Sequence, residues 1–346
     1  MLVAGDFALP FNTPVSLPIR SSSDTMVMVN SEGYLIDKEI EPSFDKGVHV
    51  NVNAFQALGE NKNLILALAN NHVMDDLDGV NRTISLAREN GFSTVGAGNN
   101  LEEAQRPLVV NEHGVPIAII NVGWDLIGCK YATKSRQGVA PLNERAIVEV
   151  IKQQKTLKNK VLIYLHWGYE TERYPLPLHR EMAHRFVDAG ADFIIGCHAH
   201  CLQGYEYYKG THIFYGIGNF AFQQKYYYEG MLGFPAYCDV GATVNWDART
   251  NEVIVNLMKY CSVSQELHLV NTGRPENLTE LQEVSCFAHL NNHDYISFFR
   301  LNRVKRKGLP IFSGKDFGLS YKMKFYFVYW RGRFIDFLVL IGVKSR

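Results

Sequence analysis

The chain has 346 residues, of which 47% are hydrophobic and 20% charged, a balance typical of a globular protein with a sizeable core. Basic and acidic residues number 35 each, so no strong net charge attracts the molecule to nucleic acid, and we expect no nucleic-acid partner. The six cysteines follow no disulfide-framework pattern and are expected to be reduced, mostly buried thiols.

The N-terminal stretch MLVAGDFALPF has no basic region before its apolar residues, so we expect no signal peptide. The longest uninterrupted apolar run, FLVLIGV at residues 337–343, is far shorter than the roughly 20 residues that a membrane-spanning helix needs. Together these features predict a cytoplasmic or membrane-peripheral protein.

Apolar runs alternate with helix-like segments along the first 260 or so residues. The runs that predict strands lie at residues 1–7, 25–33, 63–72, 93–98, 115–124, 161–168, 192–200 and 211–222. Helical spacing is seen at residues 53–62, 79–91, 143–160 and 180–191. Such alternation of strands and helices predicts an α/β fold.

The periodicity weakens after about residue 265, so we divide the chain into a main domain at residues 1–264 and a C-terminal extension at residues 265–346. Residues 278–290 favour a helix, and RVKRKG at residues 303–308 is typical of a basic linker. The tail from residue 322 combines six basic residues and one acid with many aromatics. It suits either packing on the main domain or contact with an anionic membrane surface.

Polar side chains follow the apolar runs where strands are expected to end. Because the carboxyl ends of neighbouring parallel strands meet at one edge of a sheet, we expect these side chains to converge. Carboxylates, an amide oxygen and imidazoles are suitable ligands for two closely spaced divalent cations, which activate water for hydrolysis. The side chains are Asp6, Glu32, Asn71, His72, His166, His198 and His200.

Seven sequence blocks resemble the CapA family, and they occur in its order and spacing over about residues 1–260. The family is associated with poly-γ-glutamate and other capsular polymers and belongs to the calcineurin-like metallophosphoesterase superfamily. The resemblance implies a four-layer α/β/β/α sandwich with metals at the carboxyl ends of strands, followed here by a C-terminal extension. The blocks are GDF, VNSEG, LALANNHVMD, GAGNNLEEAQRP, LHWGYE, DAGADFIIGCHAH and IFYGIGNFAF.

The resemblance also implies a role for each of the converging residues. His72 corresponds to the acid that protonates a leaving group, beside Asn71. The superfamily's first motif has a histidine two residues after the aspartate, where this chain has Ala8. The implied ligands are Asp6 and His200 for the first metal, Glu32 as the bridging carboxylate, and Asn71, His166 and His198 for the second metal.

Three further residues are candidates for the site, each with an alternative. Glu170 in HWGYE is either an additional ligand or a contact for a basic substrate group. Asp75 either orients the His72 imidazole or stabilises a helix N-terminus, and Asn219 either lies near the metals or caps a turn.

The sequence CHAHC invites a second interpretation, a structural zinc site that uses Cys197 and Cys201. Alternate residues of a strand face opposite sides, so four such ligands cannot all reach one ion from a strand. We therefore expect Cys197 in the core and Cys201 at most beside the site.

The resemblance predicts a divalent-metal-dependent hydrolase, phosphoesterase-like, that acts in capsule or exopolymer biosynthesis. It would use two ions of manganese, zinc or iron. Its substrate would be an anionic polymer or a phosphoester. The alternative is a non-catalytic metal-binding component of a capsular polymer synthesis or export assembly.

Overall fold

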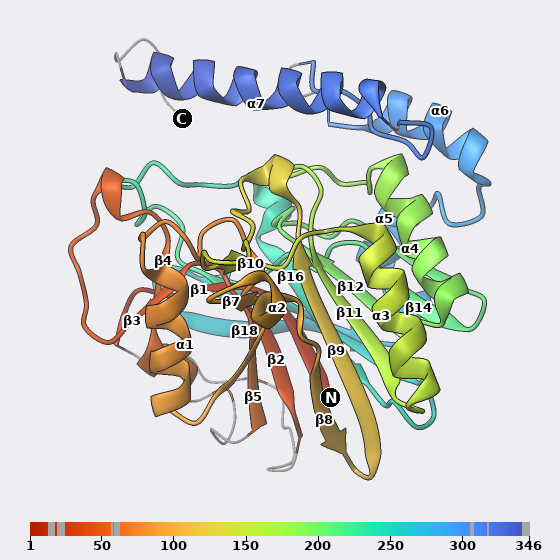
Figure 1. Ribbon diagram of the computed structural model, residues 1–346, viewed down its shortest axis with the longest axis horizontal. Helices are drawn as coiled ribbons and strands as arrows, with labels where there is room; N and C mark the ends of the chain where they lie inside the picture. The colour runs from red at the N-terminus through yellow and green to blue at the C-terminus, as the bar shows by residue number, and fades with distance from the viewer. Residues whose placement is uncertain are drawn as a thin grey trace.

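The computed structural model describes residues 1–12, 18, 25–56, 58, 63–304, 308–316 and 318–340. Two β-sheets form the body of the molecule (Figure 1). In spatial order the first sheet contains β18 (Glu266–Gly273), β17 (Val253–Cys261), β16 (Val240–Trp246), β1 (Leu2–Ala8), β2 (Val27–Ser31), β5 (Leu64–Ala67) and β6 (Ser93–Val95), with β15 (Asn219–Phe222) also paired to β1. The second sheet contains β13 (Tyr205–Tyr208), β14 (Thr211–Phe214), β12 (Phe193–Cys197), β11 (Lys160–His166), β9 (Val115–Gly123) and β8 (Leu108–Glu112).

The centre of each sheet is parallel. Strands β1, β2, β5 and β6 pair in parallel in the first sheet, as do β9, β11, β12 and β14 in the second. Antiparallel strands extend both sheets outward. Two short ladders complete the set: β3 (Tyr34–Ile36) with β4 (His49–Asn51), and β7 (Ala97–Gly98) with β10 (Gly138–Val139).

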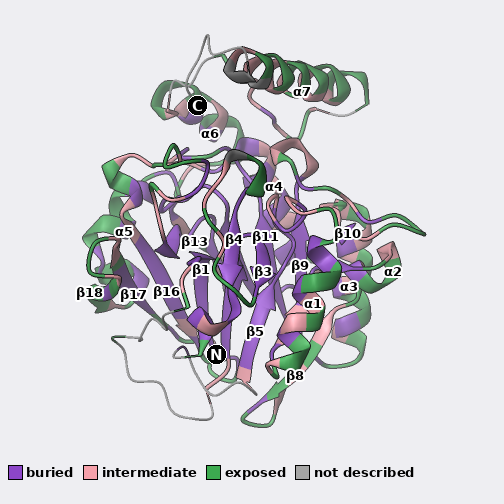
Figure 2. Cartoon of the chain, turned by 90° about the vertical axis from the view of Figure 1, so that its left-hand side faces the viewer, coloured by how far each residue is buried: buried purple, intermediate pink, exposed green. Residues whose placement is uncertain are grey.

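Alternate residues of each central strand face opposite layers, which explains why these strands are mostly apolar and almost entirely buried. Val3 and Met28 of the first sheet pack against Leu162 and Ile195 of the second, and this cluster is the core between the sheets. The other face of each sheet is covered by helices, and Figure 2 shows buried strands inside a more exposed helical surface. The four-layer α/β/β/α prediction is therefore confirmed.

The helices of the main domain are α1 (Gly79–Glu89), α2 (Leu101–Gln105), α3 (Glu144–Thr156) and α4 (Pro177–Ala189). Helix α1 packs its Val80 and Ala87 on the first sheet, whereas α3 and α4 pack on the second. Helix α3 begins at a cap in which the Asn143 side chain accepts a hydrogen bond from the Ala146 amide. Helix α4 ends at Gly190, whose φ of 115° suits a residue without Cβ.

Among the described residues, the sheets are followed by α5 (Thr279–Val284), α6 (Asn292–Asn302) and α7 (Leu319–Leu340). Helix α7 extends across the top of the molecule in Figure 1, beyond the sheet layers. Within the described part of the chain, no helix combines the length and apolarity required to cross a bilayer.

Most predicted elements are present, but two differ from expectation. The run at 211–222 is not one strand: β14 belongs to the second sheet and β15 to the first. At residues 53–62 the described part contains only a 3₁₀ turn, Val52–Phe55, and residues 57 and 59–62 lie outside the described residues. The division at residue 264 stays a prediction; strand β18, which follows it, pairs with β17.

Candidate metal centre

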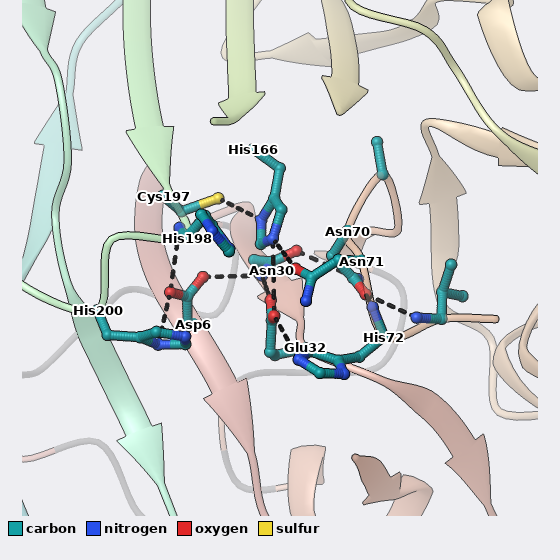
Figure 3. A network of polar contacts seen from close by, with 12 residues as sticks. Asp6, Asn30, Glu32, Asn70, Asn71, His72, His166, Cys197, His198 and His200 are labelled. Carbon is teal, nitrogen blue, oxygen red and sulfur yellow. Dashed lines mark hydrogen bonds and ion pairs between the residues drawn. The ribbon is translucent and has the colours of Figure 1, made fainter. Parts of the chain in front are cut away.

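The predicted polar residues meet where central strands of the two sheets end (Figure 3). Asp6 lies near the end of β1, and Glu32 follows β2 by one residue. Asn71 and His72 lie in the loop after β5. The second sheet supplies His166 at the end of β11, with His198 and His200 just after β12.

Asp6 is fully buried and contacts Asn30, the His198 amide and the His200 ring. Its Oδ1 accepts a hydrogen bond of 2.8 Å from Asn30 Nδ2, and its Oδ2 accepts one of 3.2 Å from the His198 amide. The same Oδ2 lies 3.3 Å from His200 Nδ1. The carboxylate therefore joins the first sheet to the loop that carries both histidines.

Glu32 is the second fully buried carboxylate. Its Oε2 accepts a short hydrogen bond from Asn30 Nδ2, so one amide group serves both acids. The other oxygen, Oε1, has no hydrogen-bond partner among the described residues. It lies 3.6 Å from His166 Nε2 and 4.0 Å from His72 Nε2.

The two neighbouring asparagines after β5 have different environments. The Asn70 side chain donates to the Ser31 carbonyl and accepts from the His72 and Val73 amides, so it fixes the shape of its own loop. The Asn71 side chain instead faces the second sheet, where its Oδ1 lies 2.7 Å from His166 Nε2. The other ring nitrogen of His166 lies 3.2 Å from Cys197 Sγ.

His198 and His200 have positive φ angles of 85° and 57°, so the chain turns sharply after β12. A glycine after an apolar run often marks such a turn, but here β12 continues through Gly196 to Cys197. A Cβ at Gly196 would lie 2.0 Å from the Tyr215 carbonyl oxygen, so close backbone approach explains the glycine. His198 Nδ1 is buried without a hydrogen-bond partner among the described residues.

His200 is held from two sides. Its Nδ1 lies 2.8 Å from Asn219 Oδ1, and Asn219 is paired with Asp6 in the β1–β15 ladder. The Phe234 ring stacks on the His200 ring with centroids 4.1 Å apart. Asn219 thus lies directly beside the candidate ligands, although it is also the first residue of a strand.

His72 belongs to a small polar group at the edge of the site. Its Nδ1 lies 2.7 Å from Asp75 Oδ2, and the Tyr228 hydroxyl lies 3.4 Å from both. Burial disfavours the charged imidazole, but the carboxylates of Asp75, Glu32 and Glu170 outweigh it and raise the pKa of His72 to about 9. His72 is therefore protonated at neutral pH.

The electrostatics of the centre favour a bound cation. Burial raises the pKa of Asp6, and burial together with the Asp6 charge raises that of Glu32 well above its usual value. Burial and neighbouring imidazoles lower the pKa of His166 and His198 well below their usual value. A divalent cation would relieve both carboxylates while leaving the histidines neutral, the form that ligates metal.

Two groups of side chains within the described residues have ligand atoms close enough to share an ion. Glu32, His166 and His198 form one, and Asp6, His166 and Cys197 the other. Glu32 and His198 both belong to the first group, and each has a buried side-chain atom without a hydrogen-bond partner among the described residues, Oε1 and Nδ1 respectively; these donors suit a metal ion. Cys201 is in neither group; its Sγ donates a hydrogen bond to the Glu172 carbonyl.

A cavity of about 1160 Å³ opens above the centre. His72, His198 and His200 line its floor, and Phe325, Tyr329 and other residues of α7 line another wall. Glu170 is exposed at this cavity. Four basic residues also line it: Lys130, Arg303, Arg331 and Arg333.

Sequence reasoning missed several residues of the site. Asn30 and Asn70 are buried polar residues in or beside strands. The available signal was an asparagine within or directly after an apolar run, because a buried amide needs hydrogen-bond partners. Tyr228 and Phe234 come from a loop between β15 and β16, and nothing in their local sequence indicates that they contact histidines.

Comparison with known proteins identifies relatives of this chain. A capsule biosynthesis protein, CapA, of Bacillus anthracis is 34% identical over 197 residues, which cover 55% of this chain and 48% of that protein. The PGA biosynthesis protein CapA of Bacillus subtilis is 33% identical over 212 residues, covering 60% and 55% respectively. The chain thus spans about half the length of these relatives.

A solved structure of a hypothetical protein from Thermus thermophilus is similar with a TM-score of 0.39 and 12% identity, covering 79% of this chain and 96% of that one. The family model described as bacterial capsule synthesis protein PGA_cap matches residues 6–224, a range that includes all the candidate ligands. The expected CapA relationship is confirmed, and the chain belongs to this bacterial capsule synthesis protein family.

Proposed function

We propose that this protein is a divalent-metal-dependent hydrolase, phosphoesterase-like, that acts in the synthesis of capsule or a related exopolymer. The observation that carries the proposal is the pair of buried, unpartnered ligand atoms, Glu32 Oε1 and His198 Nδ1, within one group that also contains His166. A cation bound by this group would satisfy both atoms. The capsule setting is supported by the CapA relatives.

The proposed ligands are Asp6 and His200 for one ion, Asn71, His166 and His198 for a second, and Glu32 between them. When bound, two such cations polarise the bond to be cleaved and activate water. Hard carboxylate and amide oxygens with imidazole nitrogens suit manganese, zinc or iron. Cys197 Sγ, beside His166 Nδ1, would orient that imidazole rather than complete a tetrahedral cysteine site.

His72 is the proposed general acid. Its Nδ1 faces Asp75, which leaves Nε2 directed toward Glu32 and the centre. In the metal-free chain the pKa of His72 is about 9, which favours a protonated ring, and the ring lines the cavity where a leaving group would emerge. Asp75 holds the tautomer and raises the basicity of the ring.

The cavity wall supports an anionic substrate, either an acidic polymer or a phosphoester. Lys130, Arg303, Arg331 and Arg333 place cationic side chains around the same space that contains the candidate ligands. Arginine in particular pairs with carboxylate and phosphate groups through two parallel hydrogen bonds. Asp75, Asp125, Glu170 and Glu172 line the same cavity, so binding of a carboxylate or phosphate group would depend on these individual cationic side chains and on bound metal rather than on a net positive wall.

The test is metal analysis and a phosphoester panel on the same preparation. We expect bound divalent metal, hydrolysis of at least one phosphoester, and loss of both in the His166→Ala/His198→Ala double variant. His184→Ala is the matched control, because His184 pairs with Glu206 outside the centre. Unchanged metal content in the double variant would remove the assignment. Full metal content without turnover on phosphoesters or peptides would favour the non-catalytic component of a polymer assembly.

A further inference from the structure

Helix α7 carries a line of large apolar side chains on one face, which we name the α7 stripe. Its members recur every three or four residues and therefore share one face of the helix. Each is more than half exposed in the described structure, and Figure 2 shows α7 as mostly exposed. The α7 stripe consists of Leu319, Met323, Phe327, Trp330, Phe334 and Phe337.

The opposite face of α7 is attached to the main domain, which fixes the direction of the stripe. Trp124 Nε1 donates a hydrogen bond of 3.0 Å to the Tyr321 hydroxyl, and the Phe312 and Tyr321 rings lie 5.2 Å apart. Lys324 Nζ lies 2.5 Å from Asp316 Oδ1. With this face packed on the protein, the stripe points away from it.

Basic side chains flank the α7 stripe. Lys322 and Arg333 are eleven residues apart, close to three helical turns, and so lie along the same flank. Arg331 lies on the other flank. The sequence of α7 has one acid, Asp336. Long basic side chains can extend beside an apolar face and place their charges at the level of lipid headgroups.

We propose that α7 lies flat in the surface of an anionic lipid membrane, with the α7 stripe at the boundary of the acyl chains. An exposed apolar face containing tryptophan and phenylalanine, with lysine and arginine beside it, suits the membrane interface. The opposite face of α7 is not polar as in an isolated interfacial helix, because its Tyr321 and Val328 pack on the protein. The same basic flanks would repel those of a second copy, which makes lipid the better-matched occupant.

Docking in this way would set the candidate centre beside the membrane. Gly332 and Ile335, on the inner face of α7, line the cavity above the centre. A substrate held at or near the lipid surface would then reach the cavity along the helix. The membrane proposal does not depend on hydrolysis, because the stripe and the metal ligands are on different parts of the molecule.

Trp330 provides a specific probe. The chain has four tryptophans, and the other three, Trp124, Trp167 and Trp246, are at most 2% exposed. The full chain is mixed with phosphatidylcholine vesicles, with or without about 30% phosphatidylglycerol. With the anionic vesicles we expect co-flotation, a blue shift of the Trp330 emission, and quenching by brominated acyl chains. High salt should weaken all three.

Variants separate the apolar component of membrane binding from the electrostatic component. Phe327→Ser with Phe334→Ser removes apolar area but keeps Trp330, and should weaken partitioning at least about tenfold. Lys322→Ser should weaken it about fivefold on anionic vesicles. The matched control is Leu157→Ser with Val263→Ser, two exposed apolar residues elsewhere, which should change nothing. Metal content should be unaffected in all of these variants.

Three outcomes would overturn the proposal. One is no partitioning onto anionic vesicles with Trp330 emission unchanged. The second is equal partitioning by the stripe variant and the control. The third is a concentration-dependent dimer, abolished by the stripe variant and insensitive to vesicles, which would assign the stripe to a second copy. If metal analysis finds no bound metal, the vesicle result is unaffected, since flotation measures only membrane binding.

Discussion

Asn71 Oδ1 lies 2.7 Å from His166 Nε2, although the two residues are 95 positions apart and follow strands of different sheets. This contact joins the end of β5 to the end of β11. In the proposed centre both atoms would be ligands of one ion. The ion would replace the proton that Nε2 donates to Oδ1, and the neutral ring would then carry its proton on Nδ1, beside Cys197 Sγ.

The two adjacent asparagines should respond differently to removal of their side chains. Asn71→Ala should lower the affinity for divalent metal at least about tenfold while leaving the fold stable. Asn70→Ala removes the amide that fixes the loop through Ser31 and Val73, and should lower the free energy of unfolding by about 1–3 kcal/mol. Isothermal titration and urea denaturation measure the two quantities. Unchanged metal affinity in Asn71→Ala would contradict the proposed ligand.

The His72–Asp75 pair predicts a measurable titration. Asp75→Asn removes the negative charge beside His72 Nδ1 and should lower the pKa of His72, from about 9, by at least about one pH unit. Since a lower pKa leaves less protonated ring at neutral pH, the alkaline limit of any hydrolysis should move to lower pH.

Nuclear magnetic resonance of ¹³C-labelled histidine in the metal-free protein measures the pKa of His72 directly. Asp76→Asn is the control, because Asp76 pairs with Arg82 on the exposed side of the loop. An equal change in both variants would show that Asp75 has no specific effect.

Much of this site could be predicted from the sequence, because each candidate ligand directly follows an apolar run that forms a strand. Because those strands pair in parallel, their carboxyl ends meet at one edge, and the side chains that follow them come together. The contacts of Asn30 could not be anticipated in this way. Its amide serves Asp6 and Glu32 together, an arrangement that exists only once β1 and β2 pair.

The C-terminal part and the 211–222 run were less predictable. Only the short stretch at residues 215–218 separates the apolar residues of β14 from β15, yet the chain leaves one sheet and enters the other within it. For the tail, the sequence left packing and membrane contact as alternatives. In the structure one face of α7 packs on the protein through Tyr321, whereas Trp330 on the other face is exposed.

Glu172 predicts a pH dependence of stability. Burial raises its pKa from 4.5 to about 7, and its Oε1 accepts a hydrogen bond of 3.1 Å from the Val304 amide. The folded chain favours the protonated carboxyl. The contribution of Glu172 to the free energy of unfolding is therefore complete below pH 4.5 and is lost as the pH rises through about 7.

Glu172→Gln keeps an acceptor for Val304 but does not titrate. Between pH 5 and pH 8 the wild-type chain should therefore lose up to about 3 kcal/mol more unfolding free energy than this variant. Urea denaturation at the two pH values gives the comparison. Parallel pH profiles of the two proteins would show that Glu172 ionises freely in the folded state.

Ala8 occupies the position where the superfamily's first motif has a histidine, and its surroundings explain why alanine is suited to this chain. Ala8 is fully buried in a cluster with Val48, Phe222, Tyr227 and Tyr228, so aromatic side chains fill the adjoining space. Ala8→His would insert a ring into a packed cluster and should lower the free energy of unfolding by about 1–3 kcal/mol.

The same substitution should not increase the amount of bound metal, because the space around Ala8 is occupied by the aromatic cluster. Ala8→Ser is the matched control and should be nearly as stable as the wild type. Urea denaturation and metal analysis on both variants decide the matter. A stable Ala8→His protein with one additional bound ion would show that the aromatic cluster yields, and that the missing ligand alone limits the first site.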